Sequence, residues 1–360
     1  MKKKILIIFG TRPEFLKLIK IIEIIRNKKK YDLKVLNTSQ HSDLLTNHLS
    51  KFKVKINFSN KSKKFNNLAD NSIYLSKYIN SKIKLFKPNL IIYQGDTLTA
   101  FLASFLANLN SIPSMHVEAG LRTFDDNNPW PEENFRAAIK NFATYHCAPT
   151  SIAKKNLLKE KIKGSDIRLT GNTIVDILEE SIKRYDIKNP ILFKSVGVPF
   201  VYVTIHRREN IGYNLNYFCT FLNKVSKKYK DLLFIIPVHS NPRIKFTIKK
   251  LLRNNKKILL IQPLDYIANL RYIYHSSFVI SDSGGIQEEV ASLNKNLLIF
   301  RKVTERPEIL KSYGMLANCN NLGDKFNKLY KQSKINHKRK NPFGDGQAST
   351  KIYNFINEII

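Results

Sequence analysis

Short runs of hydrophobic residues recur along the chain, and the segments between many of them carry apolar residues at helical spacing. A continuous apolar run is typical of a parallel strand that is covered on both faces, so each run predicts a buried strand. The alternation of strands with helices predicts an α/β fold of two doubly wound halves that face a shared cleft. The predicted strands cover residues 5–9, 33–38, 90–93, 112–117, 200–205, 232–239, 258–261, 278–280 and 297–300.

Breaks in this pattern suggest the domain limits. The register changes at residues 169–173, so we expect a first domain over 1–170 and a second domain over 171–345. A segment with Pro and Gly precedes a last helix over about 346–360, which is predicted to pack back on the first domain. Further helices are predicted over 68–86, over 98–109 and, more briefly, near 44–49.

Charged residues directly follow several of the predicted strands. Arg12 and Lys17 come after the first strand, and the carboxyl end of a strand is where open α/β sheets bind ligands. Both side chains are therefore candidate phosphate contacts. A lone arginine in this position is equally compatible with an ordinary surface residue, and this alternative stays open.

Three acidic residues come from separate loops after strands in the first half: Asp96, Glu118 and Glu132. Carboxylates that converge repel one another and raise the pKa of at least one of them, which supplies an acid and a base near neutral pH. These residues are candidates for acid–base catalysis. As an alternative, Glu132 and Glu133 simply begin a helix with a favourable placement in its dipole.

Two segments of the second half suit a phosphate. In the segment 281–289, Gly284 and Gly285 permit a tight turn from strand to helix, and Ser283 is expected to cap the helix. Its N-terminus would favour an anion, and acidic residues one turn later could bind sugar hydroxyls. The segment 206–210 places a histidine and two arginines at a strand end, well suited to diphosphate oxygens. An ordinary capped helix and a solvated basic loop are the respective alternatives.

Composition adds two constraints. Of the 360 residues, 43% are hydrophobic, enough for a sizeable core, and 61 Lys and Arg against 28 Asp and Glu give a net charge of +33. That charge raises nucleic acid or a membrane surface as partners, but the lysines are spread along the chain, which favours solvated lysine faces. Cys147, Cys219 and Cys319 fit neither a disulfide framework nor a metal site, so we expect them to be buried free thiols. With no signal peptide or membrane-spanning run, we expect a cytoplasmic protein.

Taken together, the motifs resemble the non-hydrolysing bacterial UDP-N-acetylglucosamine 2-epimerases, in the order that family has them. The resemblance implies two Rossmann-like domains in the glycosyltransferase-B arrangement, a cytoplasmic homodimer, and interconversion of UDP-GlcNAc and UDP-ManNAc for cell-surface polysaccharide synthesis. It implies no metal and no nicotinamide or other cofactor. The matching segments are residues 10–14, 94–97, 116–123, 129–133, 206–210, 237–242, 281–289, 304–308 and 341–347.

The same resemblance implies roles for individual residues. It implies Asp96, Glu118 and Glu132 as catalytic acids, with His206 beside the diphosphate. The family's route removes the C2 proton, expels UDP anti and re-adds it after protonation on the opposite face. The second domain would bind UDP. The residues expected to contact UDP or the substrate are Arg12, Lys17, Arg136, Ser283, Gly284, Gly285, Glu289 and Arg306.

Some positions leave alternatives open. Phe135 replaces an asparagine that is usual in the family before Arg136. Gln40, Arg207 and His239 match the family's effector site for UDP-GlcNAc, whereas Asp43 stands where some members have a second glutamine, so regulation at this site stays open. A related UDP-diacetamido-uronic acid is an alternative substrate. A hydrolysing 2-epimerase, a glycosyltransferase of the same architecture and a non-enzymatic polyanion binder are the remaining alternatives.

Overall fold

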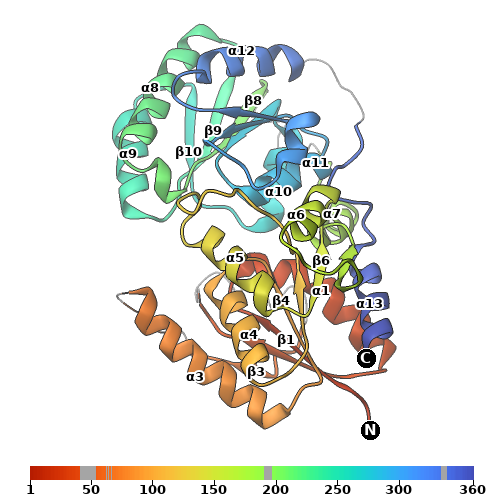
Figure 1. Ribbon diagram of the computed structural model, residues 1–360. Coiled ribbons are helices and arrows are strands. Elements are labelled where there is room, and N and C mark those ends of the chain that lie inside the picture. The colour runs from red at the N-terminus through yellow and green to blue at the C-terminus, as the bar shows by residue number, and fades with distance from the viewer. Residues whose placement is uncertain (41–53, 62, 64, 66, 190–196, 334–338) are drawn as a thin grey trace. The chain divides into compact units, whose positions relative to one another are not determined.

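The computed structural model describes residues 1–40, 54–61, 63, 65, 67–189, 197–333 and 339–360. These residues form two compact units, residues 1–177 with 343–360 and residues 178–342. Each unit is a parallel sheet flanked by helices (Figure 1). The predicted α/β class with two doubly wound parallel sheets is therefore confirmed. The helix predicted near 44–49 lies outside the described residues, and the assignment of separate functions to the two domains stays a prediction.

The first unit is built on a seven-stranded sheet with the order β3-β2-β1-β4-β5-β6-β7. The strand order reverses between β1 and β4, and such a switch point is where open α/β sheets bind ligands. The segments that carry Arg12 and Asp96 leave the sheet at this point. The strands are β1 (Lys4–Phe9), β2 (Asp32–Asn37), β3 (Phe58–Ser59), β4 (Leu90–Gln94), β5 (Ser114–Val117), β6 (Tyr145–Ala148) and β7 (Ile167–Leu169).

Helices cover both faces of this sheet, with α3 and α4 on one side and α1 on the other (Figure 1). The last helix, α13, packs against α1, and the Tyr31 hydroxyl just beyond α1 donates to Asn357 Oδ1 at 2.8 Å. The helices are α1 (Arg12–Lys28), α3 (Leu68–Phe86), α4 (Leu98–Leu109), α5 (Glu132–Phe142), α6 (Ser151–Lys159), α7 (Thr173–Arg184), which leads into the second unit, α13 (Ala348–Ile359) and the short η1 (Gly164–Asp166).

The second unit has a six-stranded sheet with the order β10-β9-β8-β11-β12-β13. Its strands are β8 (Phe200–Thr204), β9 (Leu233–Pro237), β10 (Ile258–Ile261), β11 (Phe278–Ser281), β12 (Leu297–Phe300) and β13 (Gly314–Ala317). Its helices are α8 (Tyr213–Lys228), α9 (Pro242–Leu252), α10 (Tyr266–His275), α11 (Gly284–Ser292), α12 (Leu322–Ser333) and the short η3 (Arg208–Asn210) and η4 (Pro307–Lys311).

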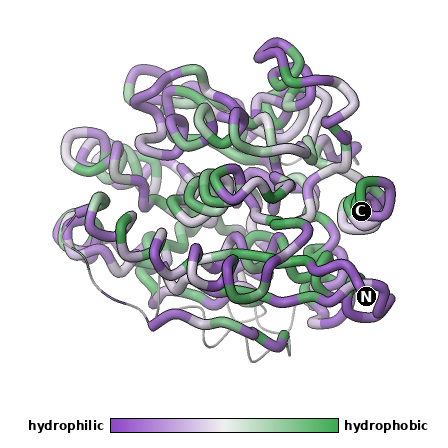
Figure 2. The backbone as a smooth tube through the Cα atoms, turned by 60° about the horizontal axis from the view of Figure 1, so that its bottom comes forward, coloured by the Kyte–Doolittle hydropathy of each residue, from purple (hydrophilic) through white to green (hydrophobic). Residues whose placement is uncertain are grey.

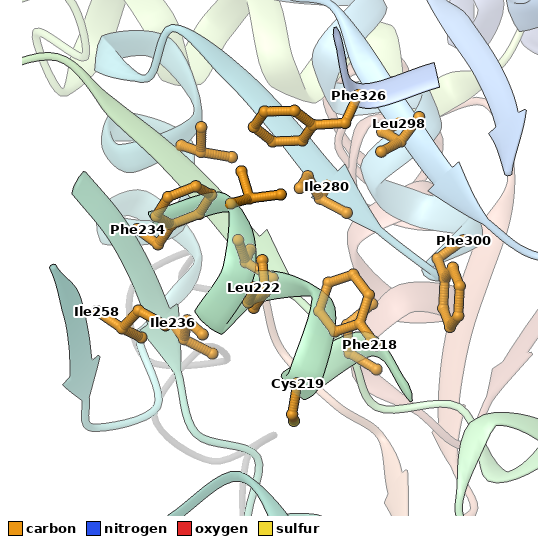
Figure 3. Close-up of a cluster of buried hydrophobic side chains, with 14 of the residues drawn as sticks. Phe218, Cys219, Leu222, Phe234, Ile236, Ile258, Ile280, Leu298, Phe300 and Phe326 are labelled. Carbon is orange, nitrogen blue, oxygen red and sulfur yellow. The ribbon is translucent and has the colours of Figure 1, made fainter. Parts of the chain in front are cut away.

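Apolar side chains from strands and helices form the core of the second unit. Figure 3 shows Phe218 and Leu222 of α8 facing side chains of the sheet, with Phe326 of α12 in the same cluster. Burial of these side chains contributes about 1.5–3 kcal/mol each. Hydropathy follows this packing, because hydrophilic residues dominate many outer turns and helix faces (Figure 2). No helix among the described residues is long and apolar enough to cross a membrane.

The thiols follow the predicted burial with one exception. Cys147 and Cys219 are fully buried, and burial raises the pKa of the Cys219 thiol to about 12. Cys319 is only half-buried and its thiol contacts Asn214 Oδ1 at 3.5 Å. The expectation of a buried third thiol is wrong, because Cys319 lies just beyond the edge strand β13.

Candidate active site

Glu118 lies directly after β5 and is held by side chains from three other segments. Lys17 Nζ of α1 lies 2.7 Å from both carboxylate oxygens, Asn172 Nδ2 donates at 3.0 Å, and Gln94 Nε2 of β4 donates as well. The side chain is almost fully buried. Its backbone φ of +66° lies in the left-handed region that few residues other than glycine adopt. Such strain is concentrated at functional sites and is maintained here by the surrounding contacts.

Asp96 follows β4 and is held by Arg136 of α5. Arg136 Nε and Nη2 lie 2.8 and 2.5 Å from Asp96 Oδ2, and its Nη1 donates to Glu133 at 2.8 Å. Glu133 also accepts from Arg122 Nε at 2.6 Å. Burial raises the pKa of Glu133, but the bond from Arg122 and the charge of Arg136 outweigh it and lower the pKa below its ordinary value. This chain of ion pairs orients one oxygen of Asp96.

Glu132 is the first residue of α5, so the simple helix-start interpretation of Glu132 and Glu133 is correct for the local structure. The two residues differ in their surroundings. Glu133 joins the ion pairs, whereas Glu132 Oε2 is buried and has no hydrogen-bond partner within the part of the chain that the structure describes. A buried oxygen without a partner is costly, so its retention favours a functional role.

Burial lowers the pKa of His116 of β5, whereas the negative charges of Asp96 and Glu118 each act to raise it. Its Nε2 lies 2.7 Å from the Gly95 carbonyl oxygen, which can only accept, so Nε2 carries the proton. Burial lowers the pKa of His116 to about 4. The imidazole is therefore neutral at physiological pH, and the structure brings Asp96 and Glu118 together around it.

Two basic candidate residues of the first unit form ion pairs with acidic candidate residues. Lys17, a predicted phosphate contact, holds Glu118, and Arg136, a predicted substrate contact, holds Asp96. Arg12 begins α1 and is half-buried. Gln40 Oε1 accepts from the backbone nitrogen and hydroxyl of Thr99 at 3.2 and 2.9 Å. Its predicted partner in an effector site, Asp43, lies outside the described residues.

In the second unit a buried acid that the sequence analysis did not single out organises the loop after β8. Asp282 is fully buried and follows β11. Its carboxylate accepts the backbone N–H groups of His206 at 3.1 Å and Arg207 at 2.9 Å, and the amide of Asn210 at 2.9 Å. Asp282 thus fixes the segment in which the sequence predicts diphosphate contacts.

Replacing Asp282 by asparagine should disturb this loop. The amide would place an NH2 group against the donors of His206 and Arg207, and at least one of these buried donors would lose its acceptor. We expect a loss of about 1–3 kcal/mol in the free energy of unfolding and weaker UDP binding, measured by chemical denaturation and by calorimetric titration. Unchanged UDP affinity would show that this loop does not contact the nucleotide.

The turn after β11 differs from expectation in one detail. Ser283 occupies the N-cap position of α11, but its hydroxyl makes no capping bond, and the predicted capping role is wrong. The hydroxyl is half-exposed at the helix N-terminus. Gly284 leaves room for two side-chain ends, because a Cβ there would lie 2.7 Å from Arg306 Nη1 and 2.8 Å from Glu305 Oε1 and would displace them. Gly285 is exposed at the first turn of the helix.

Two further candidates of this unit are held by polar side chains. Arg306 donates from Nε to Glu288 at 2.6 Å and from Nη1 to Glu305 at 2.5 Å. Glu289 accepts from Asn269 Nδ2 at 3.0 Å. Arg306 and Gly284 are therefore neighbours at the N-terminus of α11.

The rings of His206 and His239 stack at a centroid distance of 5.5 Å. Burial lowers the pKa of His239, and the nearby His206 lowers it further. Arg207 Nη2 lies 3.8 Å from Glu305 Oε1. The structure thus brings His206, Arg207 and His239 together at one end of the second sheet. Across all described residues, no group of three His, Cys, Asp or Glu side chains is placed to hold a metal ion.

The family model described as UDP-N-acetylglucosamine 2-epimerase matches residues 23–357. The chain belongs to this family. A UDP-N-acetylglucosamine 2-epimerase of Campylobacter jejuni is 37% identical, with 99% of this chain and 98% of the relative covered. The match confirms the resemblance seen in the sequence.

Solved structures of 2-epimerases show the same fold. The enzyme of Neisseria meningitidis bound to UDP-GlcNAc superposes with a TM-score of 0.92 at 33% identity, covering 99% of this chain and 100% of that one. A co-structure of S. aureus MnaA with UDP gives 0.91 at 34% identity, covering 99% and 96%. The predicted glycosyltransferase-B-like fold is therefore confirmed.

The structure adds residues that the sequence did not reveal as part of the candidate site. Gln94 and Asn172 hold Glu118, Glu133 holds Arg136, and Asp282 holds the loop after β8. Asp282 stands inside a segment already singled out, so its place beside Ser283 was an available signal. Asn172 is 54 residues from Glu118 in the sequence, and no local pattern links the two.

Proposed function

We propose that the chain inverts C2 of UDP-GlcNAc to give UDP-ManNAc without hydrolysis, by anti elimination of UDP and its re-addition. One observation carries the proposal: Asp96 and Glu118 follow the adjacent parallel strands β4 and β5, and each carboxylate is fixed by a basic partner. The N. meningitidis relative was solved with UDP-GlcNAc bound, which supports this substrate. We also propose, from the family resemblance, a homodimer that acts in the cytoplasm.

The proposed chemistry needs groups that remove and return a proton on two faces of the sugar. Asp96, Glu118 and Glu132 supply the carboxyl groups. Glu132 offers a buried oxygen that accepts no bond from the described residues, which leaves it available to a substrate proton. His116 is unsuited to this task, because its pKa is lowered to about 4 and its N–H is used by Gly95.

UDP must be bound tightly as leaving group and as returning nucleophile. We assign this task to His206 and to the N-terminus of α11, where Gly284 and Gly285 offer backbone N–H groups, Ser283 offers its hydroxyl, and the helix presents its positive dipole end. Glu289 would bind the ribose hydroxyls. In this proposal Arg12, Lys17, Arg136 and Arg306 complete the substrate contacts, either directly or through the acids they hold.

An effector role for Gln40, Arg207 and His239 is a separate part of the proposal. Arg207 and His239 lie beside His206, as a site that senses a second UDP-GlcNAc would require. Gln40 is held by Thr99 of α4 in the first unit. Dependence of the UDP-ManNAc reaction on added UDP-GlcNAc would support this role.

The reaction is tested by following exchange at C2. Purified protein incubated with UDP-GlcNAc in heavy water should produce UDP-ManNAc, with deuterium appearing at C2 of both sugars in NMR spectra. UDP-glucose, which lacks the acetamido group at C2, serves as the control substrate. Absence of exchange and conversion would contradict the proposal. Free ManNAc would indicate a hydrolysing enzyme, and a need for an added acceptor would indicate a glycosyltransferase.

A further inference from the structure

Glu14 is a fully buried acid in the second half of the first turn of α1. Its Oε2 accepts the backbone N–H groups of Gly10 at 2.9 Å and Thr11 at 2.7 Å. Its Oε1 accepts the hydroxyl of Thr97 at 2.5 Å. One carboxylate therefore binds two loops that are 83 residues apart in the sequence.

Each of these loops carries a candidate site residue. The first loop joins β1 to α1 and leads directly into Arg12, and the second joins β4 to α4 and contains Asp96 next to Thr97. Thr97 also caps α4, since its oxygen accepts the Ala100 N–H at 3.1 Å while its proton goes to Glu14. The hydroxyl of Thr97 thus couples the position of Asp96 to α1.

The loop that contains Gly10 is tightly packed against neighbouring side chains. Gly10 lies so close to the neighbouring hydroxyls that a Cβ there would be 2.2 Å from Thr99 Oγ1 and 2.3 Å from Thr38 Oγ1. Those two hydroxyls are bonded to each other at 2.8 Å. The course of the loop that leads into α1 is therefore set jointly by the bonds from Gly10 to Glu14 and by this close contact with Thr38 and Thr99.

We propose that Glu14 is a positioning residue of the site: its ionised carboxylate holds the Arg12 loop and the Asp96 loop together, and uptake of a proton loosens that hold. A carboxylate accepts at both oxygens, whereas a carboxylic acid gives up acceptor capacity at the oxygen that is protonated. The inference deepens the proposed function, because its effect on turnover requires that Arg12 and Asp96 serve the reaction.

The surroundings of Glu14 place this proton uptake in the physiological range. Burial is the largest effect and raises its pKa to about 7, although the bonds from Thr97, Gly10 and Thr11 lower it. The charged groups on the adjoining segments are already engaged: Lys17 on α1 pairs with Glu118, and Asp96 pairs with Arg136. Arg12 has bonding interactions of its own.

The pH dependence of stability and that of activity together distinguish a positioning role of Glu14 from a purely structural role. Because the folded-state pKa lies above the ordinary value of 4.5, the folded protein binds a proton that the unfolded chain has lost. The contribution of Glu14 to stability therefore decreases as the pH rises from about 4.5 to about 7. The hold on the two loops becomes stronger over the upper part of that range. A structural residue would make activity follow stability, whereas the positioning role makes them diverge.

The experiment follows the amide resonances of Gly10 and Thr11 in the full-length protein labelled with 15N, from about pH 5 to about pH 9. Both should titrate with a midpoint near 7 in the wild type and should not titrate in Glu14→Gln. In parallel, kcat/KM for UDP-GlcNAc should rise through the same midpoint in the wild type. Glu14→Gln should lack this rise and be lower by about tenfold at alkaline pH, the loss of one charge-assisted hydrogen bond.

Two variants keep the test decisive. Glu23→Gln changes a partly exposed acid on the same helix, which pairs with Lys20 at 2.9 Å, and should leave both profiles unchanged. Thr97→Val removes one of the bonds that lower the pKa of Glu14, so the Gly10 and Thr11 midpoint should move upward even if Glu14→Gln does not fold. Amides that do not titrate, or a Glu14→Gln enzyme with the wild-type pH profile, would overturn the proposal. If the wild type epimerises no UDP-sugar, the proposed function fails, while the amide titration still reports on the hold of Glu14.

Discussion

Glu118→Gln is expected to lower kcat by about 10²- to 10⁴-fold, the usual effect of removing a general acid or base. The substitution keeps the shape of the side chain but removes the charge that Lys17 contacts with both oxygens. It also places an NH2 group against the donors Gln94 and Asn172. Because the proposed UDP contacts lie on other segments, UDP binding should be retained.

The measurement is kcat from NMR detection of UDP-ManNAc, together with UDP affinity from calorimetric titration. Glu358→Gln is the matched control, since this exposed acid on α13 pairs only at the surface with Arg168. Its kinetics should equal those of the wild type. A Glu118→Gln protein that loses UDP affinity and turnover in equal measure would show that Glu118 acts as a scaffold.

Gly120→Ala should lower the free energy of unfolding by about 3 kcal/mol or more. Gly120 has a φ of +84°, and an added Cβ would lie 2.3 Å from the carbonyl oxygen of Ala153 in α6. The obstacle is backbone, so relief requires α6 to move. The same turn contains Glu118, and activity should fall together with stability.

Gly323→Ala is the control for this prediction. Gly323 lies in α12 with nothing within 4 Å of an added Cβ, and its φ is not in the left-handed region. Alanine is the better helix former, so stability should rise by about 0.5–1 kcal/mol. Urea denaturation of both variants provides the comparison, and a Gly120→Ala protein as stable as the wild type would contradict the tight turn after β5.

Most of the strands that the sequence predicts are buried, because burial leaves an uninterrupted apolar run, and the edge strand β10 was predicted from the same pattern although only one of its residues is buried. Four strands escape this signal, and one of them, the edge strand β3, is only two residues long. In β6, the fully buried His146 interrupts the run. The other two, β7 and β13, are edge strands, and two of the three residues of β7 are exposed. The helices α3 and α4 match the predicted limits, since Asn67 and Thr97 cap them and Lys87 ends α3.

The candidate site shows a similar division. Residues next to a strand end, such as Asp96 and Glu118, could be predicted because parallel strands finish at a common edge of the sheet. Their partners could not, since the pairing of Lys17 with Glu118 joins residues 101 positions apart. Part of the role of Glu14 could be predicted from the sequence. Thr11 and Glu14 have the spacing of a capping box, and the structure contains this capping box. Only the fold reveals that the same carboxylate also reaches Thr97.

Residues 343–360 belong to the first compact unit although the chain forms the second unit before them. A ribosome delivers these residues after the second unit, so the surface of α1 that α13 covers stays bare until the second unit has been synthesised. The second unit is contiguous and can fold while still attached to the ribosome. A message truncated near codon 342 would therefore yield a protein with an incomplete first unit, recognisable to chaperones and proteases by its uncovered apolar helix face.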